Sequence, residues 1–168
     1  MAAISILVIP DGSEKEYDYG DSSNYRDDDG GGATQPSDPS GDIENPSAVN
    51  SDDDDTATAI SAGGNTDLKV GYLLPPVDET AGAYEMVFDI TRIQVGGGSF
   101  GFYLVNGAGQ ELTDRQVLDE GTNTYSFTDS EENQIAANFD DLYLIIDSVT
   151  NGNGNRELEI DYFELLPV

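Results

Sequence analysis

Two runs of aspartate carry the side chains in this sequence that are best suited to binding a metal ion. Residues 27–30 read Asp-Asp-Asp-Gly, and residues 52–55 are four consecutive aspartates. Carboxylate oxygens on loops are ligands that Ca²⁺ and Mg²⁺ prefer. Neither run completes an Asp-x-Asp-x-Asp-Gly calcium loop with its distal Glu, so a solvated acidic loop is the alternative in both cases. The candidate ligands in these runs are Asp27, Asp29, Asp53 and Asp55.

Catalytic chemistry has few candidates in this chain. The sequence contains no His and no Cys, so the usual general bases, nucleophile pairs and transition-metal ligands are missing. Pairs of carboxylates can hydrolyse glycosides, but among 34 acidic residues neighbouring carboxylates arise by chance. We therefore expect no enzyme and no required cofactor, with Ca²⁺ or Mg²⁺ as the only metal ions to consider.

Three tyrosines stand among acidic residues near the N-terminus. Tyr17, Tyr19 and Tyr25 could stack on sugars or anchor this segment to a neighbouring protein. The other six tyrosines fall in expected strands, where core or sheet-surface positions are the simpler interpretation. Carbohydrate-binding platforms usually also use Trp, which this chain lacks.

The charge of the chain limits its environment and its partners. Asp and Glu number 34 against 6 Lys and Arg, a formal net charge of −28 over 168 residues. The Debye length falls from about 10 Å at ordinary ionic strength to about 3 Å at molar salt, so such a fold is favoured in concentrated salt. Without a basic footprint we expect neither nucleic acid nor an anionic membrane surface as a partner, and no apolar run reaches the roughly 18 residues of a membrane span.

Composition divides the chain into three parts. Residues 1–9 contain a short apolar run without the charged head of a signal peptide, and we interpret them as a first strand. Residues 10–55 are rich in Asp, Gly, Pro and Ser and have no helical period, which predicts a long acidic loop or arm. Residues 56–168 carry most of the apolar pattern and are expected to form one domain.

The third part is dominated by strand patterns. Small polar and apolar residues alternate in 56–61, and further strands are expected at 68–74, 84–95, 100–105 and 142–146. Weaker patterns lie at 112–118 and 125–127, and a long closing strand is expected at 157–165.

Two local signals refine this pattern. The apolar positions change parity near Thr91, which predicts a β-bulge there. Residues 129–139 are the one expected helix, with Asp129 or Ser130 as its cap. Eight or nine short strands separated by turn residues favour an all-β fold, an antiparallel two-sheet jelly-roll sandwich with a long acidic N-terminal arm.

The closing strand resembles a known family. Residues 158–165 read Leu-Glu-Ile-Asp-Tyr-Phe-Glu-Leu, which is similar to the last strand of jelly-roll carbohydrate-binding modules. In those modules an Ile-Asp-x-(aromatic or aliphatic)-x-Leu strand closes the sandwich, and its Asp can help to hold a structural calcium ion. The resemblance implies that Asp161 is a calcium ligand.

A second resemblance extends along most of the chain. The Pro-Asp-Gly turn at 10–12, the Glu-Asn-Pro loop at 44–46, the Asp-rich strand entry at 52–58 and the Glu-Ile-Asp-Tyr strand at 159–162 follow the order seen in β-sandwich modules of tailed-virus virion proteins. With the salt-adapted composition, the chain resembles a structural protein of a tailed virus of halophilic archaea.

These observations lead to one functional expectation and two alternatives. We expect a non-enzymatic virion protein, either a capsid decoration or turret subunit or a tail component, located in the extracellular particle at high salt. Its partners would be other virion proteins and copies of itself in a homo-oligomer. The first alternative is a carbohydrate-binding module that attaches to a host surface glycan, and the second is a cell-surface structural domain.

Overall fold

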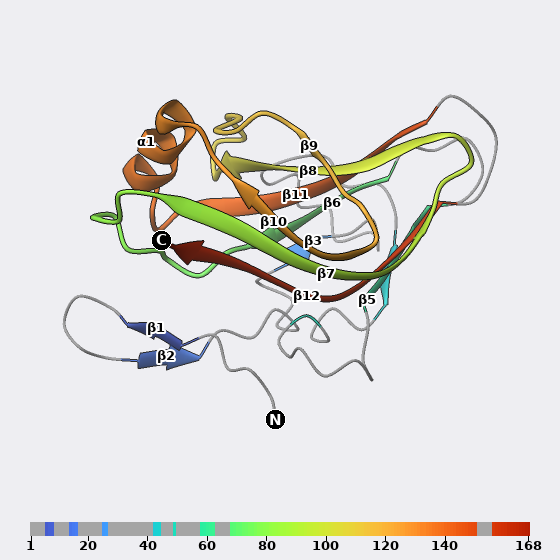
Figure 1. The fold of residues 1–168 in the computed structure, drawn as a ribbon, viewed down its shortest axis with the longest axis horizontal. Helices are drawn as coiled ribbons and strands as arrows, with labels where there is room; N and C mark the ends of the chain where they lie inside the picture. The colour runs from blue at the N-terminus through green and yellow to red at the C-terminus, as the bar shows by residue number, and fades with distance from the viewer. Residues whose placement is uncertain are drawn as a thin grey trace.

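The computed structural model describes residues 6–8, 14–16, 25–26, 42–44, 49, 58–62, 68–150 and 156–168. Strands dominate these residues, and they form two antiparallel sheets packed face to face as an all-β sandwich (Figure 1). No helix among them is long and apolar enough to cross a membrane.

The strands before residue 63 are short. They are β1 (Ile6–Val8), β2 (Glu14–Glu16), β3 (Tyr25–Arg26), β4 (Asp42–Glu44) and β5 (Thr58–Ala62). The first two pair with each other in a separate two-stranded sheet. The stretch predicted as a loop or arm thus also contributes β3 and β4, which lie at one edge of each large sheet.

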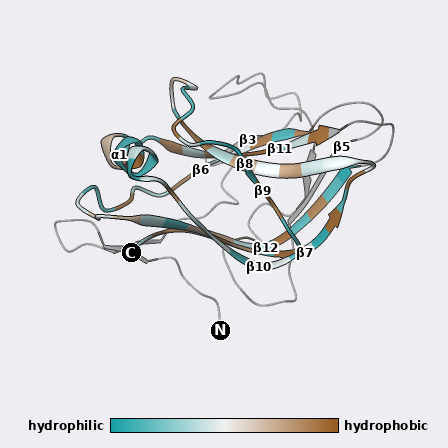
Figure 2. Cartoon of the chain, turned by 45° about the horizontal axis from the view of Figure 1, so that its top comes forward, coloured by the Kyte–Doolittle hydropathy of each residue, from teal (hydrophilic) through white to brown (hydrophobic). Residues whose placement is uncertain are grey.

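The strands after residue 68 build most of the sandwich. They are β6 (Lys69–Leu73), β7 (Tyr84–Gln94), β8 (Gly98–Asn106), β9 (Gln116–Val117), β10 (Gly121–Ser126), β11 (Leu142–Thr150) and β12 (Arg156–Pro167). The first sheet has the order β10-β7-β12-β5-β4, and the second has the order β3-β6-β11-β8-β9. Figure 2 shows the two layers one above the other, with the helix of residues 129–137 at one end.

The core lies between the two sheets, because alternate residues of each strand point inward. In β7 the buried residues are every second one from Tyr84 to Ile90. In β8, Phe100, Phe102 and Leu104 are fully buried, as their spacing predicts. The ring of Phe88 lies 4.9 Å from that of Phe102 across the core, and removal of such a buried ring costs about 3–5 kcal/mol.

A pair of irregularities bends the first sheet. Register with β12 shifts between Glu159 and Ile160 and again between Ile160 and Tyr162, so that the strand register skips Thr91 and Asp161. The bulge predicted near Thr91 is confirmed. A second bulge at Asp161 was not predicted, and it turns this carboxylate to the buried side next to Ile160.

The predicted helix is confirmed, although its cap is one residue earlier than expected. Helix α1 (Asp129–Ala137) begins after Thr128, whose hydroxyl accepts from Glu131 N while the Glu131 carboxylate accepts from Thr128 N. This reciprocal capping box satisfies two free N–H groups of the first turn. Ile135 is the buried residue that fixes α1 to the core.

Candidate functional site

The outer face of the first sheet is acidic. We call it the acidic face, and its described charged residues are Glu85, Asp89, Arg92, Glu157, Glu159 and Glu164. They alternate with buried apolar residues along β7 and β12. Five carboxylates therefore share one half-exposed surface with a single guanidinium.

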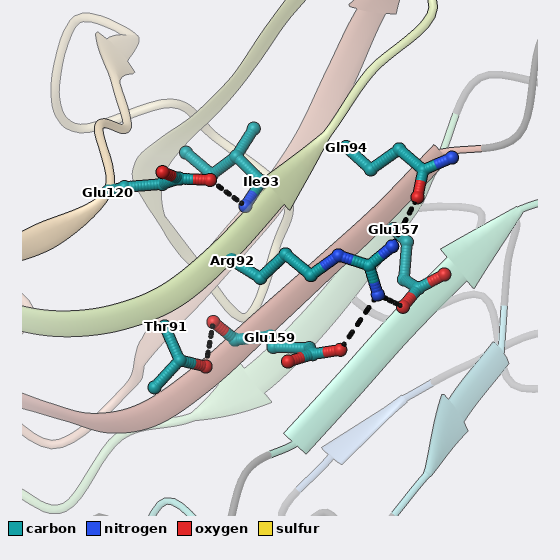
Figure 3. Close-up of polar contacts among 7 residues, drawn as sticks. All are labelled: Thr91, Arg92, Ile93, Gln94, Glu120, Glu157 and Glu159. Atoms are coloured by element: carbon teal, nitrogen blue, oxygen red, sulfur yellow. Dashed lines mark hydrogen bonds and ion pairs between the residues drawn. The ribbon is translucent and has the colours of Figure 1, made fainter.

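Arg92 is the cation around which this face is organised (Figure 3). Its Nη1 donates to Glu157 Oε1 at 2.5 Å and to Glu159 Oε1 at 3.1 Å, and its Nη2 donates to Gln94 at 2.5 Å. Arg92 is 46% exposed, so each ion pair contributes no more than about 1 kcal/mol. The cluster locally offsets the repulsion between Glu157 and Glu159.

Glu120 lies at the edge of the first sheet, beside the acidic face. Strand β10 begins at Gly121, which pairs with Ile90 of β7. The N–H of Ile93 therefore lies past the first residue of β10 and has no strand carbonyl of β10 opposite it. The Glu120 carboxylate accepts a hydrogen bond from Ile93 N at 2.9 Å (Figure 3). The Glu120 carboxylate thus accepts the hydrogen bond that a backbone carbonyl of a longer β10 would accept. This carboxylate therefore has a structural role.

The outer face of the second sheet has the opposite character. We call it the aromatic face, and its described members are Lys69, Tyr103, Val105, Arg115, Val117, Tyr143, Ile145, Asp147 and Val149. Tyr103, Val105 and Ile145 form a second apolar cluster, separate from the core, with Tyr143 packed against it. Val117 and Val149 are 49% and 50% exposed. This face therefore combines apolar and aromatic groups with two of the six basic residues of the chain.

Two glycines let large side chains lie flat on the aromatic face. A methyl group at Gly71 would stand 3.1 Å from Ile145 Cδ1, and one at Gly101 would stand 2.3 Å from Arg115 Cζ. Arg115 Nε donates to Asp147 Oδ1 at 2.6 Å, and its Nη2 donates to the carbonyl of Ser99 at 3.2 Å. The guanidinium is thereby fixed against the sheet surface.

The phenol of Tyr103 is tuned by the same surroundings. Burial raises the pKa of Tyr103 above its ordinary value of 10.0; the Lys69 ammonium opposes this shift, and the charges of Asp147 and Glu111 add to it. The hydroxyl therefore stays protonated at neutral pH and serves as a hydrogen-bonding group. It is not activated as a nucleophile.

The structure brings no predicted metal site together in the part that it describes. Asp161 is 1% exposed and lies at the bulge in β12. No group of three or more acidic side chains among the described residues is arranged to hold a metal ion. Asp27, Asp29, Asp53 and Asp55 lie outside the described residues, so their metal binding stays a prediction.

The predicted tyrosine contacts are likewise only partly described. Tyr17 and Tyr19 lie outside the described residues. Tyr25 belongs to β3 and pairs with Tyr72 of β6 at the edge of the second sheet. Of the strand tyrosines, Tyr72 and Tyr84 belong to the core as expected.

Neither the acidic face nor the aromatic face was predicted from the sequence. Two features of the sequence point toward these faces. Glu157, Glu159 and Glu164 lie on one side of the closing strand, and four of the six basic residues fall after residue 68. The pairing of Arg92 with β12 and of Arg115 with Asp147 joins residues 65 and 32 positions apart, which no local pattern predicts.

Comparison with known proteins gives no assignment. No family model matches this sequence, and a search of curated proteins finds no significant match.

Proposed function

We propose that this chain is a non-enzymatic structural protein that acts by assembly with other protein subunits. The opposite character of its two outer faces carries this proposal. The acidic face bears five carboxylates and one arginine, whereas the aromatic face bears two half-exposed valines, the partly buried Tyr143 and a flattened arginine beside the buried cluster of Tyr103, Val105 and Ile145. One face suits contact with concentrated salt solution, and the other suits contact with protein.

The composition of the aromatic face supports this division. The cores of protein interfaces are depleted in charged residues and enriched in aromatic residues and Arg. Tyr143 and Arg115 are both partly buried and held by neighbours in the same sheet, so little side-chain entropy remains to be lost on binding. The acidic face resists such burial, because each carboxylate would lose its hydration.

We also propose that the sandwich is a jelly roll. The order of the strands supports this topology: β5 lies beside β12, β6 beside β11, β7 beside β10 and β8 beside β9. Four nested antiparallel pairs of this kind result when one long hairpin is rolled into two sheets. The N-terminal acidic segment 10–55 would then be an arm that adds β3 and β4 at the sheet edges.

The site of assembly that we propose is the virion of a tailed virus of halophilic archaea. The net charge of −28 and the resemblance of the ordered motifs to virion sandwich modules support this proposal. The protein would be a capsid decoration, turret or tail component, with other virion proteins and copies of itself as partners, no cofactor and no contact with nucleic acid or membrane.

Quantitative mass spectrometry across a density gradient of a native culture lysate tests this proposal. Sedimentation of the chain with DNA-filled particles would support it, with high copy number indicating a capsid or tail-tube role. Recovery only in soluble or cell-surface fractions would refute it and make binding of a surface glycan the next hypothesis to test.

A pair of matched variants tests the role of the aromatic face. Val149→Glu places a charge on this face, whereas Val168→Glu makes the same change at an exposed terminal residue outside it. We expect the first to abolish incorporation into particles and the second to leave it intact, with both variants equally stable. Equal incorporation would exclude this face as the contact surface.

A further inference from the structure

The longest edge strand of the sandwich has no neighbour on its outer side among the described residues. Strand β10 pairs only with β7 and ends the first sheet. It contains six residues, whereas the other three edge strands, β3, β9 and β4, contain two or three. An edge strand of two or three residues offers few backbone groups for another strand to pair with. An edge strand of six residues is long enough to pair with a further strand.

Strand β10 itself carries neither the charges and prolines nor the bulge that often protect an edge strand. Its sequence is Gly-Thr-Asn-Thr-Tyr-Ser, without Lys, Pro or any charged residue. Its register with β7 is continuous over all six pairs, so no bulge twists it away. In a chain with 34 acidic residues, this uncharged and regular edge is an exception that invites pairing.

The direction of the backbone groups identifies the residues that would pair. Val168 N donates to the carbonyl of Ala83 at 3.0 Å, so every second residue of β7 from Ala83 onward directs its backbone groups toward β12. The residues between them, including Met86, direct theirs toward β10, where Met86 pairs with Tyr125. Thr124, the neighbour of Tyr125, therefore directs its N–H and C=O toward the free edge.

Core packing holds this edge in place. The ring of Tyr125 lies 5.0 Å from that of Phe102 and 6.1 Å from that of Phe88, in edge-to-face geometry. The exposed side chains of β10 are those of the outer row, Thr122, Thr124 and Ser126. A strand anchored in this way has lost most of its conformational entropy already, which favours its pairing with a partner.

We infer that β10 pairs with the β10 strand of a second copy of this chain, antiparallel about a two-fold axis, so that the two first sheets become one continuous sheet. This inference rests on the proposed assembly function. The unpaired backbone N–H and C=O groups of an edge strand are complemented by those of another edge strand. In the described part of a second copy, β10 is the longest edge strand. A two-fold contact uses the same edge on both copies.

Acidic residues flank β10 and would make this pairing depend on salt. Asp119 and Glu120 precede the strand, and Asp129 follows it. Antiparallel pairing brings the preceding acids of one copy near the following acid of the other, so that like charges repel across the contact. Because the Debye length shortens from about 10 Å at 0.1 M to about 3 Å at 1 M salt, association should strengthen as KCl is raised.

Sedimentation velocity of the full chain in molar KCl tests the inference with three variants. Thr124→Lys places a charge on the edge, and Thr124→Pro removes the outward N–H without disturbing the β7 ladder. Gln134→Lys, at an exposed position of α1, adds the same charge away from the edge. Circular dichroism and melting curves establish that each variant folds like the parent.

We expect the parent and Gln134→Lys to form dimers. Both Thr124 variants should raise the dissociation constant of the dimer by about tenfold or more. Lower KCl should weaken the parent dimer as well. A parent that stays monomeric at every KCl concentration would overturn the inference. Dimers of unchanged affinity in folded Thr124 variants would also overturn it, while co-sedimentation of the chain with particles would still support the assembly function.

Discussion

The guanidinium of Arg115 lies against the backbone of Gly101, in the space that a side chain at that position would occupy. A Cβ atom built on Gly101 would stand 2.3 Å from Cζ of Arg115. The same guanidinium reaches Asp147, the direct partner of Gly101 on β11, at 2.6 Å. A glycine on one strand thus permits an ion pair between a loop residue and the neighbouring strand.

Gly101→Ala should therefore destabilise the fold through Arg115. The new methyl group must push the guanidinium away from Asp147, and the loss of this partly exposed ion pair costs about 1 kcal/mol. Denaturant unfolding at constant high salt measures the change. In an Arg115→Ala background the same substitution should cost nothing or stabilise, because Ala is preferred over Gly in a strand by about 0.5–1 kcal/mol. Additive effects of the two changes would contradict this account.

Glu131 should link the stability of the fold to pH. Partial burial raises the pKa of this carboxyl, but hydrogen bonds from Thr128 N, Thr128 Oγ1 and Asp114 N outweigh burial and lower it below its ordinary value of 4.5. A carboxyl with a lowered folded pKa contributes stability above pH 4.5, and this contribution is lost as pH falls through the folded value.

Glu131→Gln should accordingly lower the free energy of unfolding at neutral pH by about 1 kcal/mol, since one oxygen no longer accepts. The difference from the parent should shrink as the pH falls below 4.5. Glu132→Gln, in the same turn of α1, is the control, since it removes the same charge without the three hydrogen bonds that Glu131 accepts. Equal effects of both substitutions at every pH would count against a special role of Glu131.

Arg92 should matter most at low salt. Arg92→Gln leaves Glu157 and Glu159 without their shared cation, and we expect a loss of about 0.2–1 kcal/mol in the lowest salt that still supports folding. Molar KCl should reduce this loss to near zero, because Arg92 is 46% exposed and the charges are screened. Melting curves at several KCl concentrations measure it, and a loss independent of salt would show that packing dominates over charge.

Tyr125 should contribute to unfolding in alkaline solution. Burial raises its pKa above the ordinary value of 10.0; a backbone hydrogen bond at Asp119 opposes this shift and the Asp119 charge adds to it. A raised folded pKa means that this contribution to stability is complete below pH 10.0 and is lost as pH rises through the folded value.

Tyr125→Phe should therefore flatten the fall in stability above pH 10.0. Phenolate absorbance followed in parallel with circular dichroism measures this change. The parent should contain one tyrosine that ionises only when the chain unfolds, and the variant should lack it. An unchanged alkaline profile would show that Tyr125 ionises without unfolding.

Local patterns predicted the larger elements well, because each depends on residues close in sequence. Alternation predicted the strands around Phe88 and Phe102, the parity change predicted the bulge at Thr91, and acids before Ile135 predicted helix α1. The cap at Thr128 was missed, since Thr, Asp and Ser are all competent caps and only the reciprocal bond with Glu131 selects among them.

The two faces could not be predicted from the sequence, for a physical reason. Alternation shows that Glu157 and Glu159 share a face, but it does not identify the strand that lies beside them. The partners Arg92 and Glu157 stand 65 residues apart, and the cost of closing so long a loop is repaid only by the whole sheet. The aromatic face and the edge position of β10 likewise become apparent only once the strand order is known.

The sequence by itself determined the composition and the fold class of this protein: an excess of carboxylates, the absence of His and Cys, and strand periodicity that leads to an all-β sandwich. The tertiary structure alone decided which strands are neighbours, which face is acidic, which is aromatic and which edge has no partner strand among the described residues. Net charge and the alternation of apolar residues do not depend on how the strands are arranged. Faces and edges, by contrast, form only when residues far apart in sequence pair with each other.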